Sequence, residues 1–464
     1  MTSRSSDFTL KTLHFKLLAL LLGLTLATIA RASLRGGCGK VEITPPLGIT
    51  LIGSKGQPSD VIRDGLFAKA MVLNDGTVTV AVVSVDLLYT PLEEITNPVR
   101  TLVRQRTGIA EKNVMVCATH THSGPEVFTR SKVPTEGRLD SSQIDQSYCR
   151  VLVSKIADSV QIAHRNMQEV RIGSAIGSLP EVLYNRRPRT PDGQVQMAFT
   201  IPETVAATRR LETGDDGRLR AVFDPAPGES PLQFGPIDPT VLVFRMEDAS
   251  GRVVGSIIGF GCHPVCIYPF LSTTISADYP AFATRVVEQT EGGTSLFVLG
   301  LAGNTVPLRR DVKPCEQLGK ALGGEALKRL QMATASGDVA LRAATREITL
   351  PCKAGGSSSS FTTEIQLLGL GDTWILGLPG EILVEVGLTI KERVSAKNLF
   401  VVSLANDVVG YVNHRQAYKE GGYEPGPATF LAEGAGEILI EQALSLIEET
   451  TGPGPQEKEN KGNK

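Results

Sequence analysis

Residues 114–125 read Val-Met-Val-Cys-Ala-Thr-His-Thr-His-Ser-Gly-Pro, an apolar run that ends in two histidines and a turn sequence. The run predicts a buried β-strand, and Gly-Pro predicts that the chain turns directly after it. The chain holds only six histidines, and His120 and His122 lie here two residues apart. On an extended backbone both imidazoles would leave the strand end on the same face. Two solvated histidines at a polar strand end fit the same pattern, because a zinc ion needs further ligands.

The sequence around this strand predicts an α/β fold (mixed α+β), with mixed β-sheets at the core flanked by helices in a single large domain without repeats. Apolar runs around turn sequences predict three β-hairpins, over residues 67–85, 241–260 and 364–376. Recurring apolar residues predict helices near 148–160 and 318–330, and two further helices are expected near 91–106 and 437–447. The stretch 204–235 is rich in charge, glycine and proline, so we expect an exposed insertion or a lid-like loop there.

The composition of the 464 residues, 41% hydrophobic and 21% charged, is that of a soluble globular protein. A net charge of −2 gives no electrostatic basis for binding nucleic acid, so no nucleic-acid partner is expected. The seven cysteines are too few for a disulfide scaffold, and an odd number leaves at least one of them unpaired.

Residues 1–32 differ sharply from the rest of the chain. Basic residues precede the apolar run 17–29, and Ala30-Arg31-Ala32 supplies small residues at a cleavage position, which is typical of a secretory signal peptide. A retained membrane anchor is less well supported, because the run is shorter than the ~20 residues of a membrane span. No later segment is long and apolar enough to be transmembrane. We therefore expect an exported protein, secreted or periplasmic, with a globular domain over 33–450 and a disordered tail over 451–464.

Three further strand ends carry residues that could bind a metal. His263 follows the apolar run 257–262, Glu381 follows 375–380, and Tyr411 follows a glycine after the run 400–405. Each has a simpler explanation: a His-Pro turn, a carboxylate at a helix N-terminus, and a packed tyrosine. Spacing alone leaves the histidine pair, His263 and Glu381 as a candidate zinc set.

Several motifs that include these residues resemble those of the neutral/alkaline (non-lysosomal) ceramidase family. The resembling segments, in chain order, are Gly39–Pro46, Thr119–Pro125, Asn185-Arg186, Cys262–Pro264, Leu378–Glu381, Gly410–Val412 and Gly422–Glu424. The resemblance covers about residues 36–450, nearly all of the chain after the leader, and corresponds to the N-terminal catalytic domain of the family. The immunoglobulin-like domain that follows in longer members is not expected here.

The resemblance implies a zinc hydrolase domain over 33–450 that cleaves the N-acyl bond of ceramide or a related N-acyl lipid with metal-activated water. It implies four ligands for Zn²⁺, which are His120, His263, Glu381 and Tyr411. It also implies that His122 transfers a proton, and that Arg186 and Tyr423 hold the polarised carbonyl group. Imidazole, carboxylate and phenolate are chemically reasonable zinc ligands.

The segment 298–307 departs from the family pattern, because the family's serine before the asparagine is missing there. The pocket wall beside it is therefore altered, which puts ceramide in doubt more than the zinc chemistry. A zinc hydrolase acting on a different amide or ester remains an alternative. A non-catalytic exported binding protein that retains the metal site is another.

A few other residues have less specific patterns. Asp86 ends an apolar run and could accept a hydrogen bond from a ligand histidine or simply cap the strand. His414 is a reserve ligand. Cys262 and Cys266 match no common zinc pattern, so a disulfide between them or two buried thiols is favoured. The arginines of 186–189 could form a solvated loop, and only Arg186 is predicted to act in the site.

Overall fold

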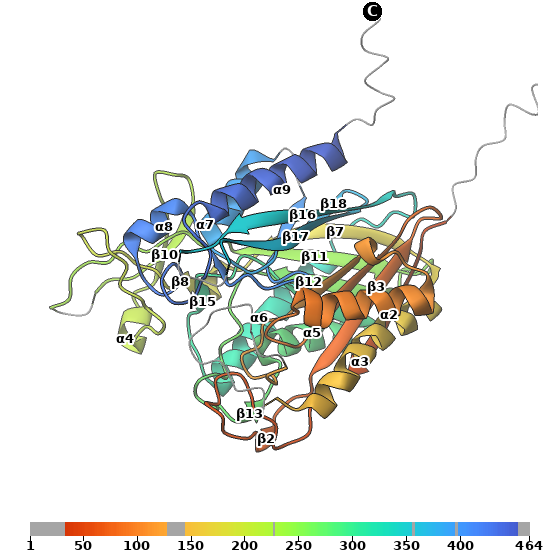
Figure 1. The fold of residues 1–464 in the computed structure, drawn as a ribbon, viewed down its shortest axis with the longest axis horizontal. Helices are drawn as coiled ribbons and strands as arrows, with labels where there is room; N and C mark the ends of the chain where they lie inside the picture. The colour runs from red at the N-terminus through yellow and green to blue at the C-terminus, as the bar shows by residue number, and fades with distance from the viewer. Residues whose placement is uncertain (1–32, 128–143, 226–227, 355–357, 395–397, 453–464) are drawn as a thin grey trace, which may run out of the picture.

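The computed structural model describes residues 33–127, 144–225, 228–354, 358–394 and 398–452. The predicted leader over 1–32 and residues 453–464 of the predicted tail lie outside this description. Three mixed β-sheets pack around a common centre, and pairs of helices cover their outer faces (Figure 1). This arrangement confirms the predicted fold class. Among the described residues, no helix combines the length and apolar composition needed to cross a membrane.

The first sheet has the strand order β5-β4-β3-β1-β6. Its strands are β1 (Arg35–Glu42), β3 (Phe67–Asn74), β4 (Thr79–Val85), β5 (Val114–Ala118) and β6 (Gln168–Glu169). Its helical segments are the π-helix η1 (Leu92–Thr96), α2 (Asn97–Thr107), the 3-10 turn η2 (Glu111–Asn113) and α3 (Gln146–Arg165). Helix α3 lies directly on β1, where a Cβ atom on Gly39 would approach the Ser159 carbonyl oxygen to 2.1 Å. The missing side chain therefore sets how closely helix and sheet pack.

The second sheet has the order β14-β12-β11-β7. It consists of β7 (Arg171–Ser178), β11 (Thr240–Glu247), β12 (Val253–Phe260) and β14 (Thr294–Leu299), with α5 (Asp278–Glu291) and α6 (Val312–Leu330) outside. The two helices lie against one another, and a Cβ atom on Gly319 would come within 2.3 Å of Phe282.

The third sheet has the order β16-β17-β18-β20. It consists of β16 (Leu341–Pro351), β17 (Ser360–Leu370), β18 (Thr373–Gly377) and β20 (Leu399–Val402), with α7 (Val384–Arg393) and α9 (Ala435–Thr451). Helix α9 ends at Thr451, beyond the predicted helix and just inside the range predicted to be a disordered tail.

The same supersecondary unit occurs once in each sheet. An antiparallel hairpin is followed by a crossover helix and by a strand parallel to the second hairpin strand: β3-β4-α2-β5, β11-β12-α5-β14 and β17-β18-α7-β20. The three predicted hairpins are confirmed, whereas the expectation of a chain without repeats misses this repeated topology. In each unit the second hairpin strand and the strand parallel to it have their carboxyl ends at the same edge of the sheet. The loops that follow these strands therefore lie at the same end of the molecule.

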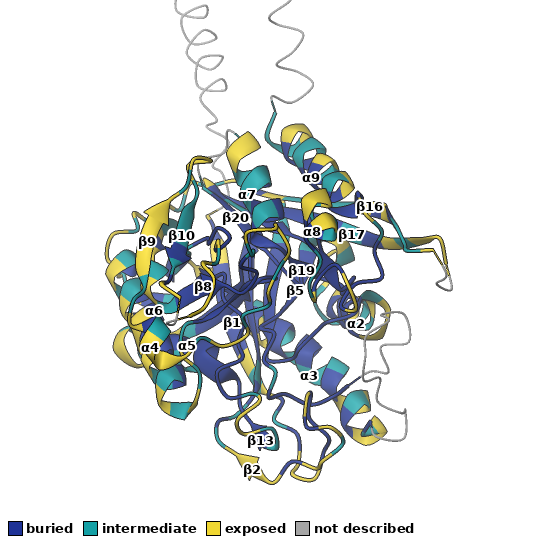
Figure 2. Ribbon diagram, turned by 90° about the vertical axis from the view of Figure 1, so that its left-hand side faces the viewer, coloured by how far each residue is buried: buried dark blue, intermediate teal, exposed yellow. Residues whose placement is uncertain are grey.

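Apolar side chains from all three sheets fill the space between them. Members of this shared core include Met71, Val82, Phe244, Leu296, Ile375 and Phe400. Each such side chain stabilises the fold by roughly 1.5–3 kcal/mol when it leaves water. Figure 2 shows the central strands buried and the exposed residues confined mainly to outer helix faces and loops.

Short paired segments connect these sheets. They are β2 (Val61–Ile62) with β13 (Thr274–Ile275), β8 (Leu183–Asn185) with β15 (Thr305–Pro307), β9 (Arg210–Thr213) with β10 (Leu219–Val222), and β19 (Glu381–Ile382) with β21 (Tyr411–Val412). The remaining helices are η4 (Pro180–Val182), α4 (Glu203–Ala206) and α8 (Arg415–Glu420). The prediction of a loop over 204–235 is wrong in part, because the β9–β10 hairpin lies within it. The Arg220–Asp216 ion pair, 2.7 Å, closes the turn of that hairpin, which local charge content did not reveal.

Candidate metal centre

Loops from all three sheets bring two histidines and a glutamate together. His120 follows β5 of the first sheet, His263 follows β12 of the second, and Glu381 follows β18 of the third. The Oε2 atom of Glu381 lies 3.2 Å from Nε2 of His120 and 3.1 Å from Nε2 of His263. The two Nε2 atoms are 3.1 Å apart. All three side chains are buried.

Backbone carbonyl groups determine which nitrogen of each imidazole carries hydrogen. The Nδ1 atom of His120 lies 3.0 Å from the Leu88 carbonyl oxygen, and Nδ1 of His263 contacts the Ala302 carbonyl oxygen. A carbonyl oxygen only accepts, so both Nδ1 atoms donate and each neutral ring keeps a lone pair on Nε2.

The lone pairs on the two Nε2 atoms point toward Oε2 of Glu381, and none of these three atoms carries a hydrogen that could form a hydrogen bond between them. Among the described residues, Oε2 of Glu381 is buried and has no hydrogen-bond donor, although both Nε2 atoms are close to it. Buried polar atoms are nearly always satisfied, and three lone pairs at this separation repel one another unless a cation lies between them. The donor set therefore fits a divalent metal ion that accepts nitrogen and oxygen ligands, such as zinc.

The charge states expected from burial agree with this donor set. Burial, followed by Arg186, lowers the pKa of His263 to about 4. Burial alone would raise the pKa of Glu381, but His120 and His263 bring it well below the ordinary range. At neutral pH His263 is thus neutral and Glu381 is ionised, which are the forms that bind metals.

His122 lies beside this group but is less enclosed. Its Nε2 atom is 3.3 Å from Nε2 of His120, and its side chain lines the adjoining cavity. Burial, followed by the other two histidines, lowers its pKa well below the usual value. The expected extended backbone is wrong, because His120 has φ of 68°, a left-handed conformation. The histidines meet because the chain turns after β5, and a hydrogen bond from the His120 amide to the Leu87 carbonyl, 2.9 Å, holds that turn.

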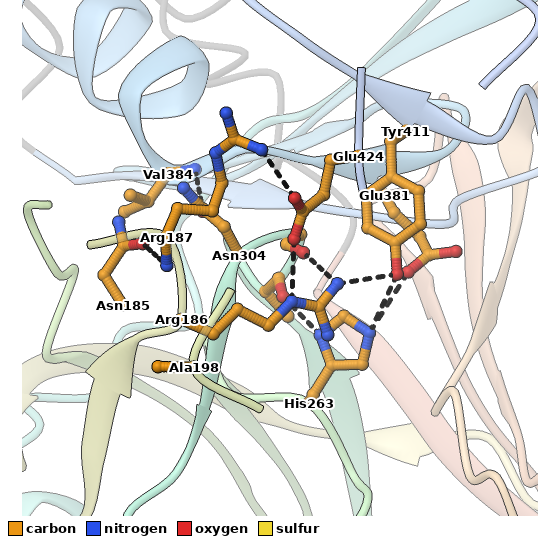
Figure 3. A network of polar contacts seen from close by, with 12 residues as sticks. Asn185, Arg186, Arg187, Ala198, His263, Asn304, Glu381, Val384, Tyr411 and Glu424 are labelled. Carbon is orange, nitrogen blue, oxygen red and sulfur yellow. Dashed lines mark hydrogen bonds and ion pairs between the residues drawn. The ribbon is translucent and has the colours of Figure 1, made fainter. Parts of the chain in front are cut away.

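Tyr411 reaches the group from β21, where it pairs directly with Glu381 of β19. Its hydroxyl lies 3.4 Å from Nε2 of His263 and accepts a 3.0 Å hydrogen bond from Arg186 (Figure 3). Burial, followed by Glu381, raises the pKa of Tyr411 well above its usual value, and Arg186 acts in the opposite direction.

Arg186 is itself held by a buried acidic partner. Its Nε atom donates to Glu424 at 2.8 Å, and its Nη2 atom donates to the Gly303 carbonyl oxygen at 3.0 Å (Figure 3). The second oxygen of Glu424 pairs with Arg187 at 2.6 Å. Arg187 is buried, so the alternative of a solvated arginine loop is wrong for this residue.

A cavity of about 540 Å³ adjoins the group. Its lining includes His122, Arg186, Glu381, Tyr411 and Tyr423, together with Tyr89, Glu126, Phe199, Tyr268 and Arg310. The ring of Tyr423 lies 5.8 Å from those of Tyr411 and Phe199. The lining contains no residue of 204–235, so that segment is not a lid over this cavity in the part of the chain that the structure describes.

Two contacts at the candidate metal centre were not predicted from the sequence. Tyr89 donates a 2.9 Å hydrogen bond to the second oxygen of Glu381. Glu424 joins both arginines, although its only sequence signal is its place after Tyr423 in a Gly-Tyr-Glu stretch. Neither contact has a local pattern, because each links segments more than 200 residues apart.

Other candidates lie elsewhere. Asp86 accepts from the Phe67 amide and the Thr119 hydroxyl rather than from a histidine, which favours the strand-cap interpretation. His414 precedes α8 and lines a different pocket. Cys262 and Cys266 are buried free thiols, as the second alternative for them predicted.

In the segment that lacks the family's serine, Asn304 binds the main chain of Val384 and the side chain of Glu385. Ala302 and Gly303 contribute carbonyl groups to His263 and Arg186. The altered segment therefore still supports the centre through its backbone.

Comparison with known proteins shows a family match over part of the chain and a shared fold. Residues 35–191 match the family described as "Neutral/alkaline non-lysosomal ceramidase, N-terminal", which confirms the resemblance carried by the motifs.

Among solved structures, the fold is similar to that of neutral ceramidase from Pseudomonas aeruginosa. The TM-score is 0.68 at 18% sequence identity, over 90% of this chain and 75% of that one. A ceramidase complexed with C2 matches equally, with a TM-score of 0.68 and 18% identity over 90% of this chain and 76% of that one. At this identity the structural matches establish a shared fold.

Proposed function

We propose that this protein is an exported, zinc-dependent amidohydrolase that cleaves the N-acyl bond of ceramide or a related N-acyl lipid. One observation carries the proposal: the lone pairs of His120, His263 and Glu381 converge without a hydrogen atom between them. The match to the ceramidase family and the ceramidase-like fold support a hydrolase of this kind. The leader pattern of residues 1–32 supports export.

His120, His263, Glu381 and Tyr411 would hold the zinc ion. When bound, zinc lowers the pKa of a coordinated water to about 7 and polarises the substrate carbonyl group. The protein's own contribution begins with fixed ligands. The Leu88 and Ala302 carbonyls hold the two imidazoles in the required tautomer, and Tyr89 holds the carboxylate.

His122 is placed to move the proton during amide cleavage. It lines the cavity next to the ligand group, with Nε2 facing His120. A neutral imidazole at this position can accept a proton from the attacking water and donate it to the departing amine. Without that transfer the amine would leave as an anion, which is a much poorer leaving group.

Arg186 and Tyr423 would bind the oxygen atom on which negative charge develops. Arg186 is fixed by Glu424 and Gly303 and lies below the Tyr423 ring, 5.9 Å from its centre. A charged donor that is already oriented stabilises a developing oxyanion without reorganisation. The cavity of about 540 Å³ is of the size that encloses the reacting part of a small ligand, and Phe199 and Tyr268 give it apolar walls.

The decisive experiment measures fatty-acid release from a panel of N-acyl substrates by purified protein, together with its zinc content. His263→Ala should lose zinc and activity, whereas His414→Ala, a histidine in a different pocket, should retain both. Stoichiometric zinc with no hydrolysis of any amide or ester would favour a binding protein and overturn the enzyme proposal. Failure of the wild-type protein to bind zinc would overturn the site as well.

A further inference from the structure

Arg310 lies in the wall of the cavity that adjoins the candidate metal centre and has no acidic partner among the described residues. It lines this cavity together with His122 and Tyr268. Its Nε atom is buried and has no hydrogen-bond acceptor among the residues that the structure describes, and no described carboxylate forms an ion pair with its guanidinium group. Its sequence neighbour Arg309 faces solvent and is paired with Glu203.

The acidic groups of the cavity do not neutralise Arg310. The carboxylate of Glu381 is directed toward His120, His263 and Tyr89. Glu126 also lines the cavity and has contacts of its own. Lys55 adds a second cationic side chain to the lining of this cavity.

A guanidinium group without a direct ion pair is energetically unfavourable in this position, although Asp278 acts at longer range to raise its pKa. Burial, followed by the nearby charge of Arg186, acts to lower the pKa of Arg310, yet arginine stays protonated in proteins. A partly dehydrated charge is ordinarily paired with an opposite charge. Arg186, in the same cavity, follows this rule through Glu424. The missing partner of Arg310 is therefore expected to come from a bound molecule.

We propose that the substrate carries an oxyanion group, a carboxylate or a phosphate, and that Arg310 binds this group. The planar guanidinium group can form two parallel hydrogen bonds to either anion. This inference rests on the proposed amidohydrolase function and narrows its substrate class from N-acyl lipids in general to anionic N-acyl compounds. A neutral amide of the same length would leave Arg310 unpaired.

The position of Arg310 in the chain connects this charge to the altered wall of the pocket. The segment 298–307, which lacks the family's serine, runs through β15 and leads directly to Arg310. One continuous stretch thus both departs from the family motif and places a cation in the cavity. Both features change the substrate side of the site, whereas the ligand histidines and Glu381 lie on other segments.

The test uses zinc-loaded protein and substrates matched in chain length but not in charge. N-dodecanoylglycine is compared with N-dodecanoylglycinamide, and N-dodecanoyl-O-phosphoethanolamine with N-dodecanoylethanolamine. We expect kcat/KM to be at least about tenfold higher for the anionic member of one pair. The neutral member lacks one hydrogen-bonded contact with a charged group, and losing such a contact lowers kcat/KM by about this factor. The pair that shows the preference distinguishes a carboxylate from a phosphate.

Three variants assign the preference to one side chain. Arg310→Gln should bring the ratio of anionic to neutral kcat/KM close to one, and Arg310→Lys should restore part of it. Arg309→Gln removes the neighbouring arginine charge outside the cavity and should keep the wild-type ratio. Zinc content and circular dichroism show whether each variant is folded and loaded.

A binding measurement decides the inference independently of turnover. Calorimetry on metal-free protein compares dodecyl phosphate and dodecanoate with dodecanol, and Arg310→Gln should weaken anion binding at least about tenfold, unlike Arg309→Gln. If the wild type shows equal kcat/KM for charged and neutral substrates and equal affinity for charged and neutral ligands, this inference is overturned. The amidohydrolase proposal would remain intact. Anion binding through Arg310 without hydrolysis or zinc would overturn the amidohydrolase proposal instead.

Discussion

Two arginines line the same cavity and differ in how their charge is compensated. Arg186, at the inner end, donates to Glu424, to the Gly303 carbonyl and to Tyr411. Arg310, farther along the wall, has no acidic partner within the part of the chain that the structure describes. The charge next to the candidate metal centre is therefore paired within the protein, whereas we infer that the charge of Arg310 is available to a substrate.

This difference separates two kinds of residue around the site. At the inner end, hydrogen bonds within the protein fix side chains before any ligand binds, which is how preorganised donors favour a transition state. At the cavity wall, we infer that the charge of Arg310 distinguishes anionic from neutral substrates. This discrimination acts on substrate binding. Changes at the inner end should thus affect zinc binding and stability, and changes at Arg310 should affect substrate preference.

The largest effect is expected at the centre itself. Glu381→Gln replaces the anionic oxygen that lies between His120 and His263 with a neutral amide. Zinc affinity should fall by more than the roughly 10–100-fold that accompanies loss of an outer hydrogen-bond partner, and hydrolysis should fall with it. Competition with a chelator measures the affinity. The control is Glu385→Gln, four residues later in the chain, because the Glu385 side chain contacts Asn304 and not the histidines. Unchanged zinc affinity in Glu381→Gln would remove Glu381 from the ligand set.

The next largest effect concerns the buried partner of the arginines. Glu424→Gln leaves Arg186 and Arg187 without the carboxylate that they share. The free energy of unfolding should fall by about 3–5 kcal/mol, because uncompensated buried charges remain. Urea unfolding of the metal-free protein measures this loss.

An exposed arginine–glutamate pair provides the control for Glu424. Glu441→Gln breaks the surface contact with Arg393 and should leave the free energy of unfolding close to that of the wild type, because solvent screens an exposed pair. Equal losses in the two variants would show that burial does not set the strength of the inner pair.

A smaller effect is expected where a single hydroxyl supports a ligand. Tyr89→Phe removes the 2.9 Å hydrogen bond to Glu381 but keeps the ring. Zinc affinity should fall by about 10–100-fold with little change in stability. Tyr418→Phe removes a hydroxyl bonded to the Leu431 carbonyl, away from the cavity, and should leave zinc affinity unchanged. Equal zinc affinities of Tyr89→Phe and Tyr418→Phe would show that the Tyr89 hydroxyl does not support the ligand Glu381.

The smallest effect is a pH dependence outside the site. Burial raises the pKa of Asp407 to about 6, with a further contribution from Glu94. The folded state then binds a proton more tightly than the unfolded state, so stability is highest below pH 4 for this group and declines as pH rises through 6. Between pH 5 and pH 7 the wild type should lose about 1 kcal/mol from this residue.

Asp407→Asn should abolish that decline without affecting hydrolysis. The amide oxygen can still accept from the Leu92 and Val408 amides, and the amide nitrogen can donate to Thr363. Urea midpoints at pH 5 and pH 7 measure the difference. A variant with the same pH slope as the wild type would show that Asp407 ionises normally in the folded protein.

Much of the fold followed from local patterns. The hairpins around 74–79, 247–253 and 370–373 were predicted because glycine and aspartate turns separate apolar runs, and the structure contains all three. Helices α3 and α6 were predicted from apolar spacing, α9 was also expected, and all three are present. The repeated topology was missed, because the same arrangement of strands and helices needs no repeated residues, only similar lengths and buried faces.

The candidate site was predicted residue by residue through family motifs, and its contacts were not. The family resemblance implies His120, His263, Glu381 and Tyr411 as ligands, and the structure brings these four side chains together. The geometry of the His120 turn was predicted wrongly, because a left-handed residue outside glycine depends on surrounding hydrogen bonds. Arg187 was undervalued, because its partner Glu424 lies 237 residues away.

The sequence by itself determined which strands, turns and chemical groups are available, since apolar period, turn residues and motifs act over a few neighbouring positions. Only the tertiary structure decided which charges are compensated. Arg309 and Arg310 are neighbours along the chain, yet one is paired with Glu203 at the surface and the other lines the cavity. The reason is physical: ion pairing depends on distance and dehydration, and both arise only when distant segments pack together.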